Sequence, residues 1–187
     1  MPDLSPWETI KRTLVLDRSP WMQVFEDDVR LPDGRIIEGY LHMKTPGYVM
    51  VVPVRSDAQI GLVRSYKRGV DGVDIQPPAG ILEQGEDPLH AAKRELKEEL
   101  GCTAEAWHEL GDVVLSGNYY AGCAHFFLAS GCRQIAEPDS GDLEEQEVIW
   151  LPLDEARRSW SEGGFHQVGA VAALGLAFQQ IEKIGFK

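Results

Sequence analysis

Residues 77–103 read Pro77-Pro-Ala-Gly-Ile-Leu-Glu-Gln-Gly-Glu-Asp-Pro-Leu-His-Ala-Ala-Lys-Arg-Glu-Leu-Lys-Glu-Glu-Leu-Gly-Cys-Thr103, and this is the most informative stretch of the chain. Its second half predicts a helix, because Asp87 is a good N-cap, Pro88 suits the first helical position and Gly101 suits the end. With 100° between successive residues, the apolar side chains form one stripe, made of Leu89, Ala92, Leu96 and Leu100. We therefore expect an amphipathic helix that packs onto a core.

The polar side of this helix separates its charges. His90, Lys93, Arg94 and Lys97 form a basic side, and Glu95, Glu98 and Glu99 gather on another. Like charges at i,i+4, here Glu95 and Glu99, cost roughly 0.2–0.5 kcal/mol when nothing relieves them. Two interpretations stay open for the helix alone. It has a solvated charged face on which Arg94 pairs with Glu98, or it offers oxygen ligands to a hard divalent cation.

The loop before the helix favours the second interpretation. Gly80 and Gly85 permit unusual backbone angles and close approach to a ligand. Glu86 adds a further acid next to the helix N-terminus, where negative charge is favoured. The loop and helix together therefore predict a metal site.

The charge balance limits the partners. The 187-residue chain has the length of one domain, with 43% hydrophobic and 26% charged residues and a formal net charge of −12. The electrostatic field of this negative charge would repel nucleic acid and anionic membranes, so we expect neither as a partner. It would also repel a small anionic substrate, unless bound cations bridge the substrate to the protein.

Cysteine usage and the lack of targeting signals favour the cytoplasm. Cys102, Cys123 and Cys132 show no metal-ligand spacing and are odd in number, which is typical of reduced thiols. The first residues lack the basic-then-apolar pattern of a secretion signal. The longest apolar stretch, Val168–Phe178, is too short to span a bilayer.

Elsewhere the sequence alternates strand-like runs with two further helices. Strands are expected at 21–31, 36–43, 48–54, 60–64, 107–115, 125–129 and 147–151, with turns at Leu31–Arg35 and at Ser56-Asp57. Asp154 is expected to cap a short helix that ends at Trp160, and a last, largely apolar helix is expected at Val168–Ile184. Strands interleaved with helices indicate an α/β or α+β sandwich.

The central stretch resembles the signature of the Nudix hydrolases: Gly, five residues, Glu, seven residues, Arg-Glu-aliphatic, any residue, Glu-Glu, any residue, Gly, aliphatic. Its fixed positions are Gly80, Glu86, Arg94-Glu95-Leu96, Glu98-Glu99 and Gly101. Every fixed identity is present, and only Cys102 departs, in the last, aliphatic position. The resemblance implies the α/β fold class, as a Nudix-type α/β/α sandwich with a mixed β-sheet.

The resemblance also implies a metal-dependent hydrolase, in which water attacks a phosphorus atom of a diphosphate. The cofactor would be Mg²⁺, with Mn²⁺ possible. Glu95 and Glu99 would be the principal metal ligands, Glu98 a further ligand or a water-holding residue, and the carbonyl of Ala79 would complete the inner shell. Arg94 would orient Glu86 or Glu98 through ion pairs.

Beyond the signature, the chain is similar to the ADP-ribose or nucleoside diphosphate sugar pyrophosphatase branch of that family. The similarity rests on Leu31–Arg35, Val63–Arg68, Pro78–Ile81 and Trp150–Ala156. It implies that residues 1–45 form a small N-terminal antiparallel β element that builds a homodimer, and that 46–187 form the hydrolase domain.

In that branch, basic residues at the end of a strand contact the substrate, which implies a role for Arg64, Lys67 and Arg68. A solvated strand end is the equally open alternative. Tyr119 and Tyr120 offer flat surfaces with polar tips that suit a base or a ribose.

A glutamate in the loop 139–147 would serve as the catalytic base or as an extra metal ligand. Glu144 is the first candidate and Glu145 the second. A merely solvated acidic loop is nearly as good an interpretation.

Departures from the branch leave the substrate open. Lys67 replaces the usual Arg, and Gln76 replaces the usual Glu. Hydrolysis of a dinucleoside polyphosphate, a CoA derivative or a nucleoside triphosphate is therefore an alternative. A nucleotide sensor of the same fold that does not catalyse hydrolysis is another alternative. Loss of a signature glutamate would favour the sensor, and none is lost.

Overall fold

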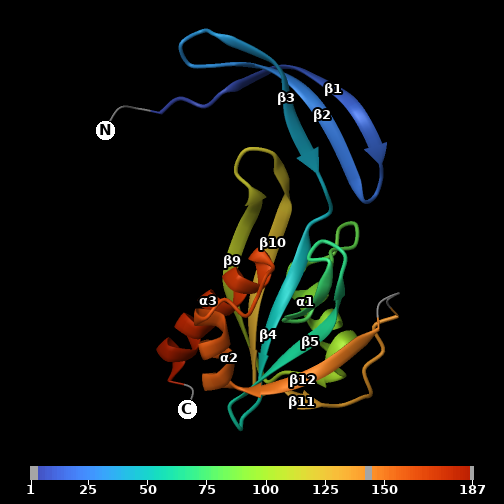
Figure 1. Ribbon diagram of the computed structural model, residues 1–187, viewed down its shortest axis with the longest axis vertical. Helices are drawn as coiled ribbons and strands as arrows, with labels where there is room; N and C mark the ends of the chain where they lie inside the picture. Colours follow the sequence, from blue (N-terminus) through green and yellow to red (C-terminus); the bar gives the residue numbers. More distant parts are fainter. Residues whose placement is uncertain (1–3, 142–144, 186–187) are drawn as a thin grey trace. The chain divides into compact units, whose positions relative to one another are not determined.

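The computed structural model describes residues 4–141 and 145–185 (Figure 1). Its contacts divide the chain into two units. The first comprises Met1–Gly47 with Val113–Cys123, and the second comprises Tyr48–Asp112 with Ala124–Lys187.

The strands are β1 (Glu8–Arg18), β2 (Met22–Arg30), β3 (Ile36–Lys44), β4 (Tyr48–Val54), β5 (Gln59–Lys67), β6 (Gly72–Gln76), β7 (Ala79–Ile81), β8 (Cys102–Thr103), β9 (Ala106–Ser116), β10 (Tyr120–Ser130), β11 (Arg133–Gln134) and β12 (Gln146–Pro152). The helices are α1 (Pro88–Leu100), α2 (Leu153–Ser161) and α3 (Val168–Ile184). Strands β9 and β10 contribute residues to both units.

The first unit is built on an antiparallel sheet in the order β1-β2-β3. The expected turn joins β2 to β3, with Gly34 at a φ of +86° and a hydrogen bond from its N–H to the carbonyl of Leu31. Buried Asp27 accepts two hydrogen bonds from Arg12 of the neighbouring strand, at 2.8 and 2.6 Å. This ion pair couples β1 to β2.

The second unit contains the mixed sheet. Strand β10 runs parallel to β4, while β4 and β12 are both antiparallel to β5. Strands β4 and β5 pair only at Val54 and Ile60, so β6 pairs with the far half of β5 and β7 with the first half of β4. The chain between β6 and β7 thus enters a region where the two central strands have separated.

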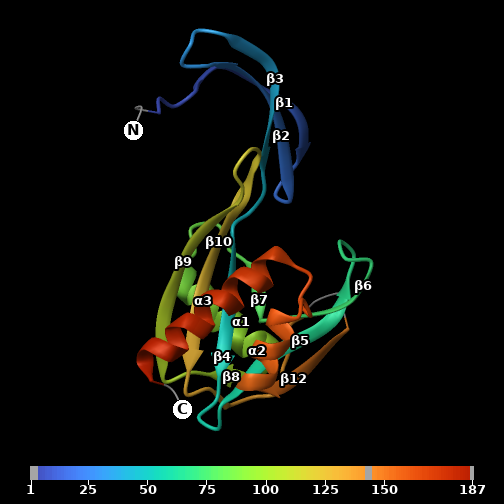
Figure 2. The ribbon, with the colours of Figure 1, turned by 60° about the vertical axis from the view of Figure 1, so that its left-hand side comes forward.

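Helices cover both faces of this sheet. On β4, Val49 and Val51 pack in a core with Leu96 of α1. The alternate residues of β4, Tyr48 and Met50, lie beside Gly169 of α3. Figures 1 and 2 show α2 and α3 together on one side of β4 and α1 on the other. The predicted α/β/α sandwich with a mixed sheet is therefore confirmed.

Two local expectations need correction. Asp154 does not cap α2, because the helix begins at Leu153 and Asp154 lies in its first turn. Strands β1, β6, β7, β8 and β11 are not among those expected from the sequence. Polar residues interrupt the apolar pattern of β1, and β6 and β7 are short strands held in place by β5 and β4. Within the described residues, none of the helices has both the length and the apolar character needed to cross a membrane.

Candidate active site

The site is built on α1, which has the predicted bounds and caps. Asp87 accepts a hydrogen bond from the N–H of His90 at 3.0 Å, and Gly101 ends the helix at a φ of +64°. The three carboxylates of this helix lie in different environments. Glu95 and Glu99 are only 8% and 4% exposed, whereas the side chain of Glu98 is 39% exposed. The helix therefore carries two buried acids beside one that is open to solvent.

The backbone of β7 lies directly against the two buried carboxylates. The N–H of Ala79 donates to Oε2 of Glu99 at 2.9 Å. A β-carbon built on Gly80 would lie 1.8 Å from Oε1 of Glu95, so only glycine leaves room for this carboxylate. Pairing of Gly80 with Val49 of β4 fixes β7 in this position. The loop that precedes the helix thus forms one wall of the site.

Arg94 joins the acids of the signature. Its Nη1 donates to Glu95 at 2.5 Å and to Glu98 at 2.9 Å, and its Nε and Nη2 donate to the two oxygens of Glu86, each at 3.1 Å. These contacts raise the pKa of Arg94, with the hydrogen bond to Glu86 as the largest cause. The same hydrogen bond lowers the pKa of Glu86 to about 2. All of these acids are therefore held close to one guanidinium.

The residues present fit a hard divalent cation in their chemistry. Buried carboxylates require a charged partner or strong hydrogen bonds, and oxygen donors are the ligands that magnesium prefers. In the part of the chain that the structure describes, no three His, Cys, Asp or Glu side chains converge on one point. Glu95 and Glu98 direct oxygens toward Arg94, and Glu99 directs one toward the N–H of Ala79.

A second strand, from a distant part of the sequence, also reaches Glu99. The side-chain amide of Gln146, the first residue of β12, donates to Oε1 of Glu99 at 3.5 Å. Gln146 is not among the site residues predicted from the sequence. The register of β12 on β5, which the sequence does not display, brings it to α1.

The acidic loop between β11 and β12 is anchored on α1. The N–H groups of Ile135 and Ala136 donate to the carbonyl of Gly101 at 2.8 and 3.0 Å, and that of Asp139 donates to the carbonyl of Glu98 at 2.8 Å. Glu144 lies outside the described residues. Its neighbour Glu145 is exposed and lines a cavity of about 580 Å³ together with Arg64, Ser65, Tyr66, Val73, Gln146 and Glu147.

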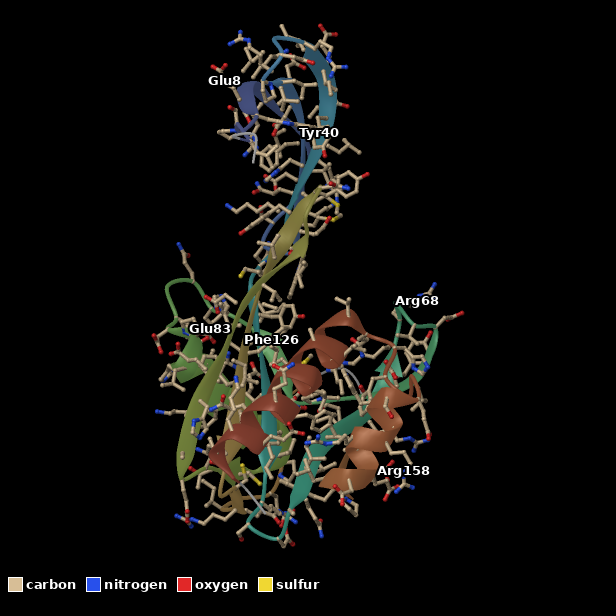
Figure 3. The ribbon with its side chains drawn as sticks, turned by 90° about the vertical axis from the view of Figure 1, so that its left-hand side faces the viewer. Glu8, Tyr40, Arg68, Glu83, Phe126 and Arg158 are labelled. Carbon is tan, nitrogen blue, oxygen red and sulfur yellow. The ribbon has the colours of Figure 1, made fainter. Side chains whose placement is uncertain are left out.

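The three basic residues in the last part of β5 and directly after it are not gathered at one point. Nη1 of Arg64 pairs with Glu147 at 2.9 Å beside that cavity. Arg68 pairs with Asp71 at 3.0 Å, and its side chain is 85% exposed and points away from the ribbon (Figure 3). Lys67 is half-buried at the end of β5. Only Arg64 of the three lines this cavity.

The two predicted tyrosines belong to the first unit. The ring of Tyr120 stacks on that of His42, with centroids 5.6 Å apart and planes at 6°. The carbonyl of Tyr119 accepts a hydrogen bond from the N–H of Met43 at 2.8 Å. Both tyrosines remain about 40% exposed, at 44% and 39% for Tyr119 and Tyr120. The tip of the β9–β10 hairpin is thus fixed against β3.

A further buried acid was missed by the sequence analysis. Asp74 of β6 is 4% exposed and accepts hydrogen bonds from Nδ1 of His166 at 2.9 Å and from Nε2 of Gln167 at 3.2 Å. Its position within a short strand gave no signal. This contact ties the start of α3 to the strand that leads into the Pro77–Gly80 loop.

Comparison with known proteins places the chain in a family. The NUDIX domain model matches residues 44–168, and the model for the nucleoside diphosphate sugar hydrolase N-terminal domain matches residues 7–40. The ADP-ribose pyrophosphatase of Bacillus subtilis (strain 168) is 31% identical over 136 residues, which cover 72% of this chain and 73% of that protein.

Two other similarities extend over more of the chain. A protein named methanol dehydrogenase activator, from Bacillus methanolicus, is 31% identical over 151 residues, or 79% of this chain and 80% of that protein. A crystal structure of an ADP compounds hydrolase covers both chains completely with a TM-score of 0.86 at 22% identity, which shows the shared fold.

These matches agree with the signature, since the NUDIX match contains Gly80, the carboxylates of α1 and the strands that position them. They also confirm the similarity to the ADP-ribose and nucleoside diphosphate sugar pyrophosphatase branch that the sequence indicated. The chain belongs to the Nudix hydrolase family.

Proposed function

We propose that this hydrolase uses magnesium to cleave the diphosphate bond of ADP-ribose or of a nucleoside diphosphate sugar. The observation that carries the proposal is the pair of buried carboxylates, Glu95 and Glu99, packed against the β7 backbone beside Gly80. The name of the Bacillus subtilis relative and the match of the N-terminal residues to nucleoside diphosphate sugar hydrolases support the substrate class.

The metal would be held by the acids of α1 and by the loop before it. Glu95 and Glu99 are the proposed principal ligands of Mg²⁺, for which Mn²⁺ can substitute, and Glu98 and the carbonyl of Ala79 add further oxygen atoms. When bound, the cation neutralises the diphosphate and lowers the pKa of a water molecule that attacks phosphorus. Bound cations also explain how a chain with a net charge of −12 accepts an anionic substrate.

Arg94 has a positioning role in this proposal. One guanidinium that bonds to Glu86, Glu95 and Glu98 keeps these three carboxylates close together despite their mutual repulsion. Arg94 and Glu86 are expected to act through the metal ligands, whereas Glu98 is expected to act on the attacking water. The planar fork of arginine supports several such bonds at once, which lysine cannot reproduce.

The decisive test of the metal assignment is Glu99→Gln. Turnover should be abolished, because a ligand oxygen becomes a neutral amide, while the fold should persist. The melting temperature can even rise in the absence of metal, because one of the repelling charges at i,i+4 is gone. Glu109→Gln, an exposed glutamate on β9, is the matched control. Full activity of Glu99→Gln at ordinary magnesium concentration would remove Glu99 from the ligand set.

A glutamate of the acidic loop is the proposed general base. Glu144 is the first candidate and Glu145 the second, since the loop that follows β11 is hydrogen-bonded to the end of α1 and is followed by Gln146 beside Glu99. Loss of a general base usually costs about 10²–10⁴ in rate. If Glu144→Gln and Glu145→Gln each lower turnover less than about tenfold, the base lies elsewhere.

Substrate contacts are proposed for Arg64, Lys67 and Arg68 on phosphate or ribose, and for Tyr119 and Tyr120 on the base or ribose. Lysine at position 67 offers a point charge where arginine would offer a fork, so phosphate binding should persist with looser orientation. We therefore expect weaker selectivity among nucleoside diphosphate derivatives than in the related branch.

The substrate test compares kcat/KM for ADP-ribose, a hexose nucleotide, a dinucleoside polyphosphate, a CoA derivative and a nucleoside triphosphate. ADP-ribose and the hexose nucleotide should lead. A clear preference for the triphosphate or the CoA derivative would contradict the substrate class and leave the hydrolase assignment in place. No hydrolysis of any compound would instead favour a nucleotide sensor.

We also propose a homodimer formed through residues 1–45, with 46–187 as the hydrolase domain. The first unit exposes large apolar side chains, among them Trp7 at 51%, Trp21 at 66% and Ile36 at 55%. Such surface is typical of a protein interface. Analytical ultracentrifugation at micromolar concentration should give the mass of two chains, and a fully active monomer would refute this proposal. The odd number of cysteines, without metal-ligand spacing, supports a cytoplasmic location.

A further inference from the structure

The carboxylate of Glu99 is held on both of its oxygens by groups from distant parts of the chain. Oε2 accepts from the backbone N–H of Ala79, at 2.9 Å. Oε1 accepts from Nε2 of Gln146, at 3.5 Å. Because Glu99 is 4% exposed, these protein contacts rather than bulk water decide where its oxygens point.

The sheet fixes the direction of Gln146. In the antiparallel pairing of β12 with β5, Gln146 lies opposite Ser65, which is 3% exposed. Residues directly opposite each other across two strands present their side chains on the same face. Ser65 in turn lies opposite Asp74 of β6, so the three strands carry a row of polar residues at this level.

The middle residue of this row, Ser65, differs from Asp74, whose carboxylate is hydrogen-bonded. Among the described residues, the buried hydroxyl of Ser65 has no hydrogen-bond partner, and a buried unpaired polar group is destabilising. Gln146 is the member of the row that reaches the catalytic helix.

We propose that Gln146 is a positioning residue for Glu99. Its amide holds Oε1 while the β7 backbone holds Oε2, so that the carboxylate is presented to the cation in one orientation. A hydrogen bond of 3.5 Å is long, and contacts of this kind commonly shorten when the active complex forms. Because Gln146 immediately follows the acidic loop, it also links the end of that loop to Glu99.

This inference rests on the proposed role of Glu99 as a metal ligand. Partners that orient a ligand from outside the inner shell typically change metal affinity by 10–100-fold when they are removed. The expected signature of Gln146 is therefore weaker metal binding with an otherwise competent enzyme. A purely structural residue would instead lower turnover at every metal concentration.

The test is Gln146→Met, which keeps the length of the side chain and removes its donor. Isothermal titration of the full-length apo-protein with Mn²⁺ should show a Kd roughly tenfold higher than for the unsubstituted chain. The metal concentration for half-maximal turnover should rise by the same factor, and excess metal should restore most of kcat. Gln59→Met is the matched control, because Gln59 lies at the other end of the same strand pair, opposite Pro152.

Three outcomes separate the possibilities. An unchanged Mn²⁺ Kd in Gln146→Met, together with loss of binding in Glu99→Gln, overturns the role of Gln146 and leaves the proposed function intact. Unchanged binding in both variants overturns the metal assignment itself, and the inference with it. If Gln146→Met melts at a much lower temperature than the unsubstituted chain, Gln146→Leu is measured as well. Loss of turnover at all metal concentrations in both variants also overturns the proposal.

Discussion

The backbone of Gly80 and the carboxylate of Glu95 occupy adjoining space: a β-carbon on Gly80 would lie 1.8 Å from Oε1 of Glu95 and 2.0 Å from its carboxyl carbon. These two residues come from β7 and α1, and the contact exists only because β7 pairs with β4 on one side and faces α1 on the other. The glycine of the signature therefore has a steric role at the site.

Gly80→Ala should displace the Glu95 carboxylate and lower kcat/KM by roughly 100-fold, since a shift of about 1 Å in a catalytic group can have that effect. The measurement is steady-state turnover of the preferred nucleotide substrate. Gly69→Ala is the control, because a β-carbon there meets nothing within 4 Å. Unchanged activity of Gly80→Ala would show that Glu95 tolerates a new position.

Gly101→Ala should lower the free energy of unfolding by more than the strain of its backbone alone. Gly101 has a φ of +64°, a conformation that costs an L-residue about 1–2 kcal/mol, and its β-carbon would lie 2.1 Å from the carbonyl oxygen of Ala136. Gly163→Ala isolates the backbone strain, because Gly163 has a φ of +81° and a β-carbon there would meet nothing within 4 Å. Urea denaturation of both variants measures the difference, and equal losses would contradict the role of the clash.

The ion pair of Glu86 should make stability depend on pH in the acid range. Its hydrogen bond to Arg94 lowers the pKa of Glu86 from 4.5 to about 2. Because the pKa is lower in the folded state, the unfolded chain binds the proton first as the pH falls. The stabilisation is therefore complete above pH 4.5 and is lost as the pH falls toward 2.

Melting curves of the unsubstituted chain and of Glu86→Gln between pH 7 and pH 3 test this sign. The advantage of the unsubstituted chain should be constant near neutrality and shrink below about pH 4.5. A difference that stays the same down to pH 3 would mean that Glu86 does not gain its stabilisation from its charge.

The contact between Asp74 and His166 should contribute about 1 kcal/mol, because it is a hydrogen bond to a charged group whose histidine partner is 60% exposed. A double-mutant cycle of Asp74→Asn and His166→Ala, followed by urea denaturation, measures this coupling. Strictly additive losses would show that His166 contributes nothing through Asp74.

The local parts of this molecule could be predicted from the sequence. Helix α1 has the expected bounds because its cap residues, Asp87 and Gly101, act on the backbone within a few positions of themselves. Helix α3 likewise spans the expected Val168–Ile184. The start of α2 was placed wrongly because Asp154 has the composition of a cap but lies inside the first turn.

The amino-acid sequence by itself determined the family signature, the helix that carries its acids and the separation of those acids from the lysines, since each is a matter of residue type and spacing. Tertiary structure alone decided which acids are buried. Glu95 and Glu99 are enclosed by β7, while Glu98, one residue from Glu99, remains open to solvent. It also decided that Gln146, 47 positions from Glu99, reaches its carboxylate. The physical reason is that strand pairing and packing join residues that are distant in the chain, and a sequence pattern reports only the faces of each element, not which faces meet.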